Sequence, residues 1–433
     1  MHVPIVIALG AWALSAAAGA PSISSPPQPE TRAAPSRTGN SQPGDAPALA
    51  ASMDRLSGYV SGEARLFFHD ALYPGQADQD GSLAAQPEYY HQWQDGSSFT
   101  LTPFGRLDSA DTRRTHWDIR ELNYLYPQDG WFFRVGVGKV FWGATEFVHL
   151  VDVINQTDLV EHIDGEDKLG QPMVEFSITR DWGTLDVFFL PYFRERTFPG
   201  RQGRLRPAVV IDTEHPLYES PSKQSNVDVA ARYSRTFGDM DFGIYLFKGT
   251  NRDPLLVPSE VLDPNATGEP RLIPFYDQIT QVGTDIQWAM GNWLWKLEAL
   301  WRDGYLDSHF AAVGGLEYTL VGFAGSRTDV GLVAEYAWDQ RGDDPTTTSL
   351  FDNDLFLGLR LTPNDTVSTQ LLMGVMQDLG EAETVLTIEA SRRLGSHWRL
   401  ILDAWFFLAQ PEDSILYDIR DDDFLRLELA YFF

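Results

Sequence analysis

The chain contains no cysteine in 433 residues, which excludes disulfides, thiolate metal sites and cysteine nucleophiles. Basic residues are also scarce: 33 Lys and Arg stand against 61 Asp and Glu, for a net charge of -28. Such an excess of negative charge repels nucleic acids and anionic membrane surfaces. We therefore expect no nucleic-acid partner.

Long apolar runs are missing after the first twenty residues. Residues 1–20, MHVPIVIALGAWALSAAAGA, are shorter than the ~20 apolar residues that a spanning helix needs once flanks are discounted. They predict a secretory signal peptide cleaved after Ala18 or Ala20, with an uncleaved anchor as the alternative. Residues 21–56 are rich in Pro, Ser and Ala without periodicity, which predicts a flexible leader. The folded part is expected over residues 57–433.

Aromatic residues, by contrast, are abundant, and they follow a two-residue period. In GNWLWKLEALWRDG, Trp293 and Trp295 fall on one face, whereas Lys296 and Glu298 fall on the other. The terminal DDDFLRLELAYFF alternates in the same way and ends on Phe433. This alternation is typical of β-strands with one apolar and one charged face.

Turn signals divide the chain into segments of about ten residues. Short turns are predicted at residues 94–97, 126–131, 180–184, 236–240, 289–293, 323–327, 362–366 and 393–397. Longer polar connections are predicted at residues 70–85, 145–171, 199–224, 250–274 and 409–421. The count is about eighteen strands, with sixteen as the alternative, and it places both chain ends on the side of the short turns.

The charged faces decide between two all-β architectures. Ionised side chains are expensive in the dry core of a soluble multi-sheet protein, whereas a wide barrel leaves an aqueous lumen that hydrates them. The apolar faces would then contact lipid. We therefore predict a transmembrane antiparallel β-barrel.

The last strand, LELAYFF, resembles the C-terminal strand of Gram-negative outer-membrane proteins, and the layout of residues 57–433 resembles that of porins. The resemblance implies a location in the bacterial outer membrane and insertion by the barrel-assembly machinery. It also implies contact with outer-membrane lipid and lipopolysaccharide. It does not identify a subfamily, and it leaves monomer and homotrimer open.

By this strand count, residues 145–171 form the third external loop. In classical porins that loop folds into the lumen, so the resemblance implies acidic loop residues facing charged wall residues; a cap over the barrel mouth is the alternative. The predicted loop residues are Glu146, His149, Asp152, Asp158, Glu161, Asp164, Glu166 and Asp167. The predicted channel-lining residues are Arg106, Asp118, Arg120, Arg134, Arg194, Lys296, Glu298, Arg302, Arg360 and Arg426.

Chemistry is not indicated by any motif. The chain has no nucleophile motif of the G-x-S-x-G type, and HIDGEDK at residues 162–168 departs from the spacing of a calcium loop. We expect no enzymatic activity, no cofactor and no metal. The predicted function is passive passage of small polar solutes. The alternative is a closed barrel that acts as a surface scaffold or adhesin through its long loops.

Overall fold

The computed structural model of the protein describes residues 52–263, 269–342, 351–380, 382–412 and 414–433. Within these ranges, eighteen strands form one antiparallel sheet. They are β1 (Met53–Phe67), β2 (Gln79–Gln92), β3 (Ser98–Asp108), β4 (His116–Gln128), β5 (Trp131–Gly138), β6 (Gln171–Arg180), β7 (Gly183–Leu190), β9 (Asp228–Phe237), β10 (Met240–Thr250), β13 (Gln278–Met290), β14 (Trp293–Asp303), β15 (His309–Leu320), β16 (Asp329–Asp339), β17 (Asn353–Thr362), β18 (Gln370–Asp378), β19 (Thr384–Leu394), β20 (Trp398–Ala409) and β21 (Phe424–Phe432).

The sheet closes on itself because the first and last strands pair. Tyr59 lies opposite Phe432, and Phe67 lies opposite Phe424. Strand β1 also pairs with β2, so both of its edges are satisfied. The predicted transmembrane-type barrel and its strand number are confirmed. The first strand begins at Met53, inside the segment that we assigned to the leader; the signal peptide and most of that leader lie outside the described residues.

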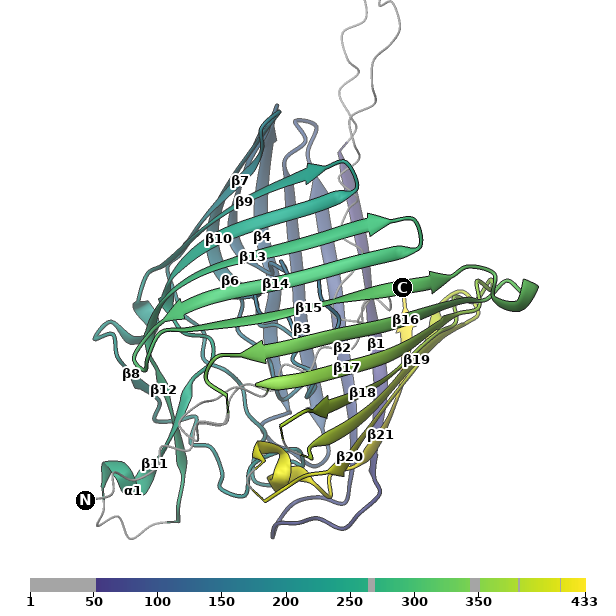
Figure 1. The fold of residues 1–433 in the computed structure, drawn as a ribbon. Coiled ribbons are helices and arrows are strands. Elements are labelled where there is room, and N and C mark those ends of the chain that lie inside the picture. Colours follow the sequence, from purple (N-terminus) through teal and green to yellow (C-terminus); the bar gives the residue numbers. More distant parts are fainter. Residues whose placement is uncertain (1–51, 264–268, 343–350, 381, 413) are drawn as a thin grey trace, which may run out of the picture.

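Short turns and long connections alternate around the barrel (Figure 1). Each predicted short turn is found, and the tightest use glycine with a positive φ, as at Gly130 (φ 73°) and Gly291 (φ 62°). A positive φ suits the right-handed twist of a hairpin and is strained for other residues. The first long connection was predicted too long, because β2 already begins at Gln79 and continues the alternation.

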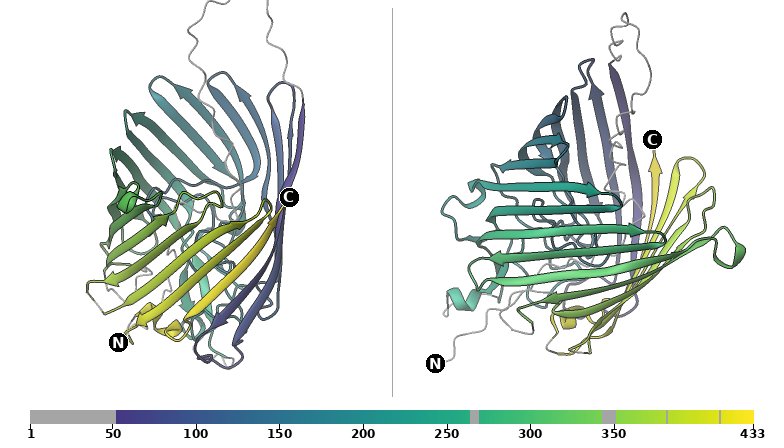
Figure 2. Two further views of the ribbon diagram at one scale, coloured as in Figure 1. Left: turned by 90° about the vertical axis from the view of Figure 1, so that its right-hand side faces the viewer. Right: turned by 45° about the horizontal axis from the view of Figure 1, so that its top comes forward.

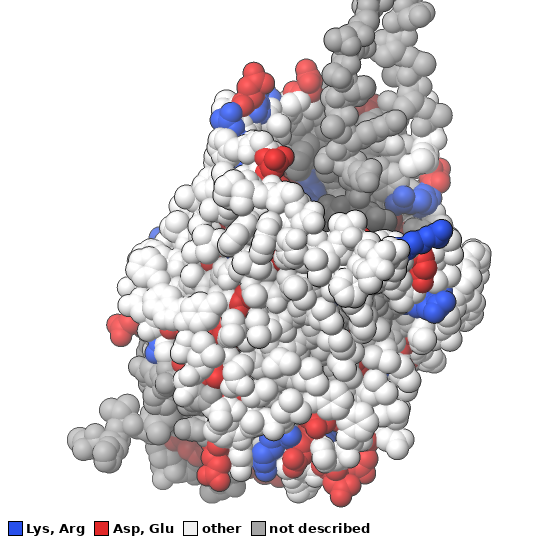
Figure 3. Space-filling view, turned by 45° about the vertical axis from the view of Figure 1, so that its right-hand side comes forward, with Lys and Arg blue, Asp and Glu red and all other residues white. Residues whose placement is uncertain are grey.

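The outer wall is apolar between two charged rims (Figure 3). Aromatic side chains gather outside near the short turns: the ring centroids of Trp293 and Tyr318 lie 4.4 Å apart, and those of Trp398 and Tyr431 lie 5.0 Å apart. An apolar band bordered by aromatic residues is the outer surface that a barrel presents to a bilayer.

The last strand shows how its alternation is used. Leu429 and Tyr431 remain 41% and 37% exposed on the outside. Arg426 points inward and forms ion pairs with Glu63 of β1 at 2.9 Å and Asp403 of β20 at 2.7 Å. The charged face therefore lines the lumen, as the pattern predicted.

The long connections carry small elements of their own, which the sequence did not indicate. Strands β8 (Leu217–Tyr218), β11 (Leu255–Pro258) and β12 (Leu272–Tyr276) form a three-stranded sheet, next to the short helix α1 (Ser259–Leu262). Single turns of 3-10 helix are η1 (Lys223–Ser225), η2 (Phe323–Gly325) and η3 (Ile415–Ile419). In the described ranges, every helix is too short or too polar to cross a bilayer.

Candidate functional site

The connection between β5 and β6, residues 139–170, runs through the interior of the barrel; we call it the third loop. Its apolar side chains Phe147, Val151, Ile154 and Ile163 are all buried. Figure 2 shows chain segments inside the cylinder of strands in both views. The loop begins a few residues before the predicted range, and its inward position corresponds to the constriction alternative rather than to an external cap.

One wall carboxylate organises the start of the third loop. Glu298, in the middle of β14, accepts hydrogen bonds from the backbone N–H groups of Ala144 (2.6 Å), Thr145 (2.9 Å) and Val151 (3.2 Å). The Thr145 hydroxyl donates to the same carboxylate at 2.7 Å. Since loop backbone has no strand partner inside a barrel, a carboxylate that accepts several N–H groups satisfies donors that would otherwise be buried unpaired.

A second wall carboxylate continues this anchor. Glu335 of β16 accepts the N–H groups of Glu146 and Phe147, each at 2.8 Å. The side chain of Glu146 itself contacts two wall cations, Arg360 at 2.8 Å and Lys296 at 3.3 Å. The wall of strands β14 to β17 thus holds the loop through alternating charges.

The far end of the loop is held by the opposite wall. Asp158 forms an ion pair with Arg120 of β4 at 2.7 Å, and Glu161 forms one with Arg106 of β3 at 2.7 Å. Arg120 also contacts Asp118 at 3.2 Å. Because strands β3–β4 and β14–β17 lie on different sides of the barrel, the third loop crosses the lumen.

Apolar packing fills the lumen on the side of the long connections. Phe147 of the third loop stacks on Phe356 of β17, with ring centroids 5.5 Å apart. The same buried cluster includes Phe198, Leu256 and Leu416 from three other long connections. This packing closes the external half of the barrel around the loop.

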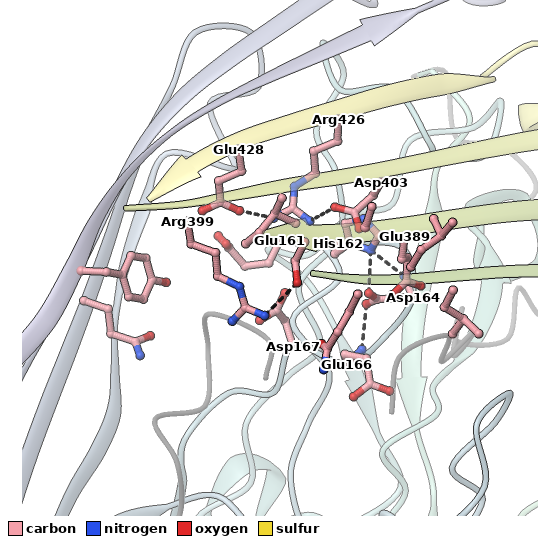
Figure 4. A pocket seen from close by; sticks show the side chains of 18 of the residues that line it. Glu161, His162, Asp164, Glu166, Asp167, Glu389, Arg399, Asp403, Arg426 and Glu428 are labelled. Atoms are coloured by element: carbon pink, nitrogen blue, oxygen red, sulfur yellow. Dashed lines mark hydrogen bonds and ion pairs between the residues drawn. The ribbon is translucent and has the colours of Figure 1, made fainter. Parts of the chain in front are cut away.

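The lumen that remains is divided into separate cavities. A cavity of about 160 Å³ lies on the turn side of the loop, between residues 161–167 and strands β17 to β21 (Figure 4). A second cavity of about 90 Å³ lies on the other side of the loop and is lined by His149, Asp152 and Arg302. The loop stands between two polar spaces.

The pKa values of the third loop's titratable side chains are shifted by burial and by neighbouring charges. Burial raises the pKa of Asp167, and together with the neighbouring Glu161 and Asp164 it brings that pKa to about 6. Burial alone would also raise the pKa of Asp158, but Arg120 beside it holds that pKa well below the usual range. Burial opposes the charged form of His149, yet Glu166 and Glu298 raise its pKa well above the ordinary value.

The remaining predicted residues fall into three groups. Arg134 and Arg302 lie on the wall and pair with Glu175 at 2.5 Å and Asp253 at 3.1 Å. Asp152, Asp164 and His149 make contacts within the loop: Asp152 accepts the N–H groups of Trp142 and Gly143, Asp164 contacts His162 at 2.9 Å, and His149 contacts Glu166 at 3.2 Å. The prediction for Arg194 was wrong in one respect, because β7 ends at Leu190 and Arg194 reaches Asp118 from the following connection.

Several charged residues of the interior were missed. Glu63 of β1 contacts Arg106 and Arg426, and it also contacts Arg114 at 2.7 Å. Glu335 lies in β16 (Asp329–Asp339), where the two-residue period gives its inward direction but not its partners. Arg114 lies in a connection, where the two-residue period gives no direction.

Two groups of described residues have the spacing of metal ligands: His116 with Asp158 and Glu161, and Asp352 with Asp354 and Asp378. The first group does not fit a metal, because Arg120 and Arg106 already contact its carboxylates. The second is an acidic cluster at the external rim. Neither adds a metal to the predicted site.

No protein-family model matches the chain, and no curated protein matches it in sequence. Solved structures with a similar fold include the outer-membrane protein OmpT of Vibrio cholerae (10% identity, 89% of this chain and 100% of that chain, TM-score 0.43). A mutant of the Rh. blastica porin matches at 11% identity, 88% and 100% coverage and a TM-score of 0.42. Wzi of Escherichia coli, described as a carbohydrate-binding β-barrel of group 1 capsule assembly, matches at 11% identity, 86% and 83% coverage and a TM-score of 0.48.

The chain is an outer-membrane-type β-barrel. That statement rests on the pairing of its own eighteen strands and on its apolar outer band.

Proposed function

We propose that the protein lies in the bacterial outer membrane and conducts small polar solutes through a lumen that the third loop gates. The supporting observation is the loop itself, which crosses the interior between two polar cavities and is held to the wall largely by charges. Ion pairs and charged hydrogen bonds can exchange for water when the loop moves, whereas a wholly apolar plug would expose oily surface. No catalytic step is part of the proposal.

Wall charges set what can pass. The inner face presents paired arginines and carboxylates, on neighbouring strands for Arg134 with Glu175 and across the intervening β10 for Arg232 with Asp285. Charges of both signs that line a narrow passage favour polar solutes and exclude apolar ones. The solute therefore has to be small and hydrated.

Planar-bilayer recordings test the gate. The intact chain is expected to show rare or small openings, and a variant that lacks residues 152–167 is expected to show larger, longer ones. This deletion removes Asp158 and Glu161, so the double substitution Arg106→Gln and Arg120→Gln is combined with it to avoid unpaired wall charges. The matched comparison carries the two wall substitutions with the loop intact; because they remove both anchors of the loop's far end, its openings should fall between those of the intact chain and of the deletion variant.

Folding of each variant is checked by the heat-dependent shift of its electrophoretic mobility. A folded deletion variant that stays electrically silent would overturn the channel. Equal, large conductance of the intact chain and the deletion variant would overturn the gate.

A second candidate, a closed surface scaffold, is favoured by one specific observation. The cluster around Phe147, Leu256 and Leu416 joins the third loop to three other connections in a single apolar core. A barrel closed in that way presents its long connections as a rigid external surface. Silent barrels in every variant, with unchanged folding, would support this function instead.

A further inference from the structure

The turn-side cavity carries more acid than base. Seven acidic and five arginine side chains line it, in addition to His162. Its lining comes from the third loop, from the turn-side parts of β17 to β20, and from positions nearer the long connections such as Arg106, Arg120 and Arg426. The cavity is polar, enclosed by the wall and distinct from the apolar core on the external side.

The arginines of this cavity are largely neutralised by acids that they already contact. Arg106 contacts Glu63 and Glu161. Arg426 contacts Glu63, Asp403 and Glu428. Arg120 and Arg360 are likewise paired, with Asp118 and Asp158 and with Glu146 and Glu317. Arg399, the fifth, donates to the Ser391 hydroxyl at 2.9 Å, so it is the cation of the lining that remains to offset the other carboxylates.

Two carboxylates of the cavity are left over. Among the described residues, Asp167 of the loop and Glu389 of β19 make no side-chain ion pair or hydrogen bond. Asp164 contacts only the His162 ring through its carboxylate, apart from the N–H of Glu166 that it accepts. Figure 4 shows the acids of the loop and those of the wall directed toward the same space.

A buried ring nitrogen is also without a partner. His162 is 5% exposed, and its Nε2 atom has no hydrogen-bond partner. The ring is fixed by edge contacts to Trp405 and Phe424, with centroids 6.1 Å and 6.3 Å away. It lines the cavity beside Asp164, Glu389 and Asp403 (Figure 4). Buried polar atoms normally have a partner, so an orphan in a cavity indicates a missing ligand or water.

The spacing of these groups excludes a bare metal ion as the best occupant. The two described sets with metal-ligand spacing do not include Asp167 or Glu389. Carboxylates that belong to no such set can each receive a different donor of a larger cation. The volume of about 160 Å³ holds a molecule of a few heavy atoms, and Tyr59 and Phe104 supply an apolar side for its carbon chain.

We propose that the turn-side cavity binds a small organic cation whose ammonium or guanidinium groups donate to Asp167, to Glu389 and to Nε2 of His162. Nε2 accepts in the tautomer whose Nδ1–H donates to the Asp164 carboxylate, 2.9 Å away. If the bound cation is also the conducted solute, this inference rests on the proposed function. Binding of the cation is tested without any conductance measurement.

The test uses three four-carbon compounds that differ only in charge: putrescine, 1,4-butanediol and succinate. Each is titrated calorimetrically into the folded full chain in neutral detergent at low ionic strength. Putrescine is expected to bind, and the neutral and anionic compounds are not. Glu389→Gln and Asp167→Asn should each weaken putrescine binding roughly tenfold, because each removes one charged contact. The matched control is Glu260→Gln, at an exposed position of α1.

Three results would overturn the inference: no putrescine binding by the folded chain, equal binding of 1,4-butanediol, or unchanged affinity in both cavity variants. A titration with Mg²⁺ alone distinguishes a metal site from a site for an organic cation. Tighter binding of Mg²⁺ than of putrescine would overturn the proposal of an organic cation. Putrescine binding by a barrel that never conducts would reject the proposed channel and leave this inference standing. Conductance without putrescine binding would do the reverse.

Discussion

The external half and the turn-side half of the lumen are built on the same strands but have opposite chemistry. Along β17 the inward positions pass from Phe356 to Arg360, and along β19 they pass from Val385 to Glu389. Strand β20 carries Trp405, which is fully buried, in the external half and Arg399 near its turn. The inner faces of these three strands are therefore graded, from an apolar packing surface to a charged one. This grading lets one barrel hold both a packed plug and a polar cavity.

The largest effect is expected where charge anchors the packed half. Glu298→Ala removes the acceptor of three backbone N–H groups and one hydroxyl of the third loop. Donors left buried without a partner should lower the free energy of unfolding by roughly 3–5 kcal/mol. Urea unfolding of the detergent-folded barrel measures this loss.

Glu298→Gln is the control for that experiment, because an amide oxygen still accepts hydrogen bonds. It should lose clearly less stability than Glu298→Ala. If the alanine variant unfolds at the wild-type urea concentration, the carboxylate does not hold the loop and the packed half stands without it.

The next effect concerns apolar packing. Phe147→Ala removes the ring that stacks on Phe356. Truncating a buried Phe to Ala typically lowers the free energy of unfolding by about 3–5 kcal/mol. The loop should also open more often in bilayer recordings, because its position depends on this contact. Phe310→Ala, at a side chain that is exposed on the outer wall, is the control and should change neither property as much. Similar losses in both variants would mean that the external half is not a packed core.

The strands of the wall could be predicted from the sequence, whereas the contacts of the third loop could not. The alternation in segments such as residues 291–304 gave the strands, their inward charges and the strand number, because period and side are linked in a strand. Phe356 and Trp405 occupy inward positions of their strands, as the charged residues do. Apolar residues at inward positions are the sequence signal of a packed plug, but only the charged residues entered the prediction. The loop contacts were not predictable, since Glu298 and Thr145 are far apart in sequence and the interaction uses backbone donors. Arg194 was misplaced because the alternation continues for a few residues after β7 has ended.

A smaller effect depends on pH and lies at the border between the two halves. The pKa of Asp167 is raised to about 6 by burial and by Glu161 and Asp164, so the folded state favours the protonated form. The contribution of Asp167 to stability is present at low pH and is lost as the pH rises through about 6. Asp167→Asn should therefore raise the unfolding midpoint clearly more at about pH 7.5 than at about pH 4.5, which lies between the ordinary pKa of 3.8 and the raised pKa of about 6. Equal shifts at both pH values would show that the asparagine acts through packing rather than through charge.

The smallest effect is expected at the hydrated turn-side rim. Arg55 contacts Glu88 at 2.8 Å, but its side chain is 55% exposed, so water replaces the contact when it is lost. Arg55→Gln should change the free energy of unfolding by less than about 1 kcal/mol.

Arg120→Gln is the matched comparison inside the barrel. The Arg120 side chain is 3% exposed, and among the described residues its loss leaves the buried Asp158 side chain with only His116 and Thr197 as partners. That variant should lose roughly 3–5 kcal/mol, as expected when one member of a buried pair is removed. Equal losses at the two positions would mean that the lumen around Arg120 is as hydrated as the rim.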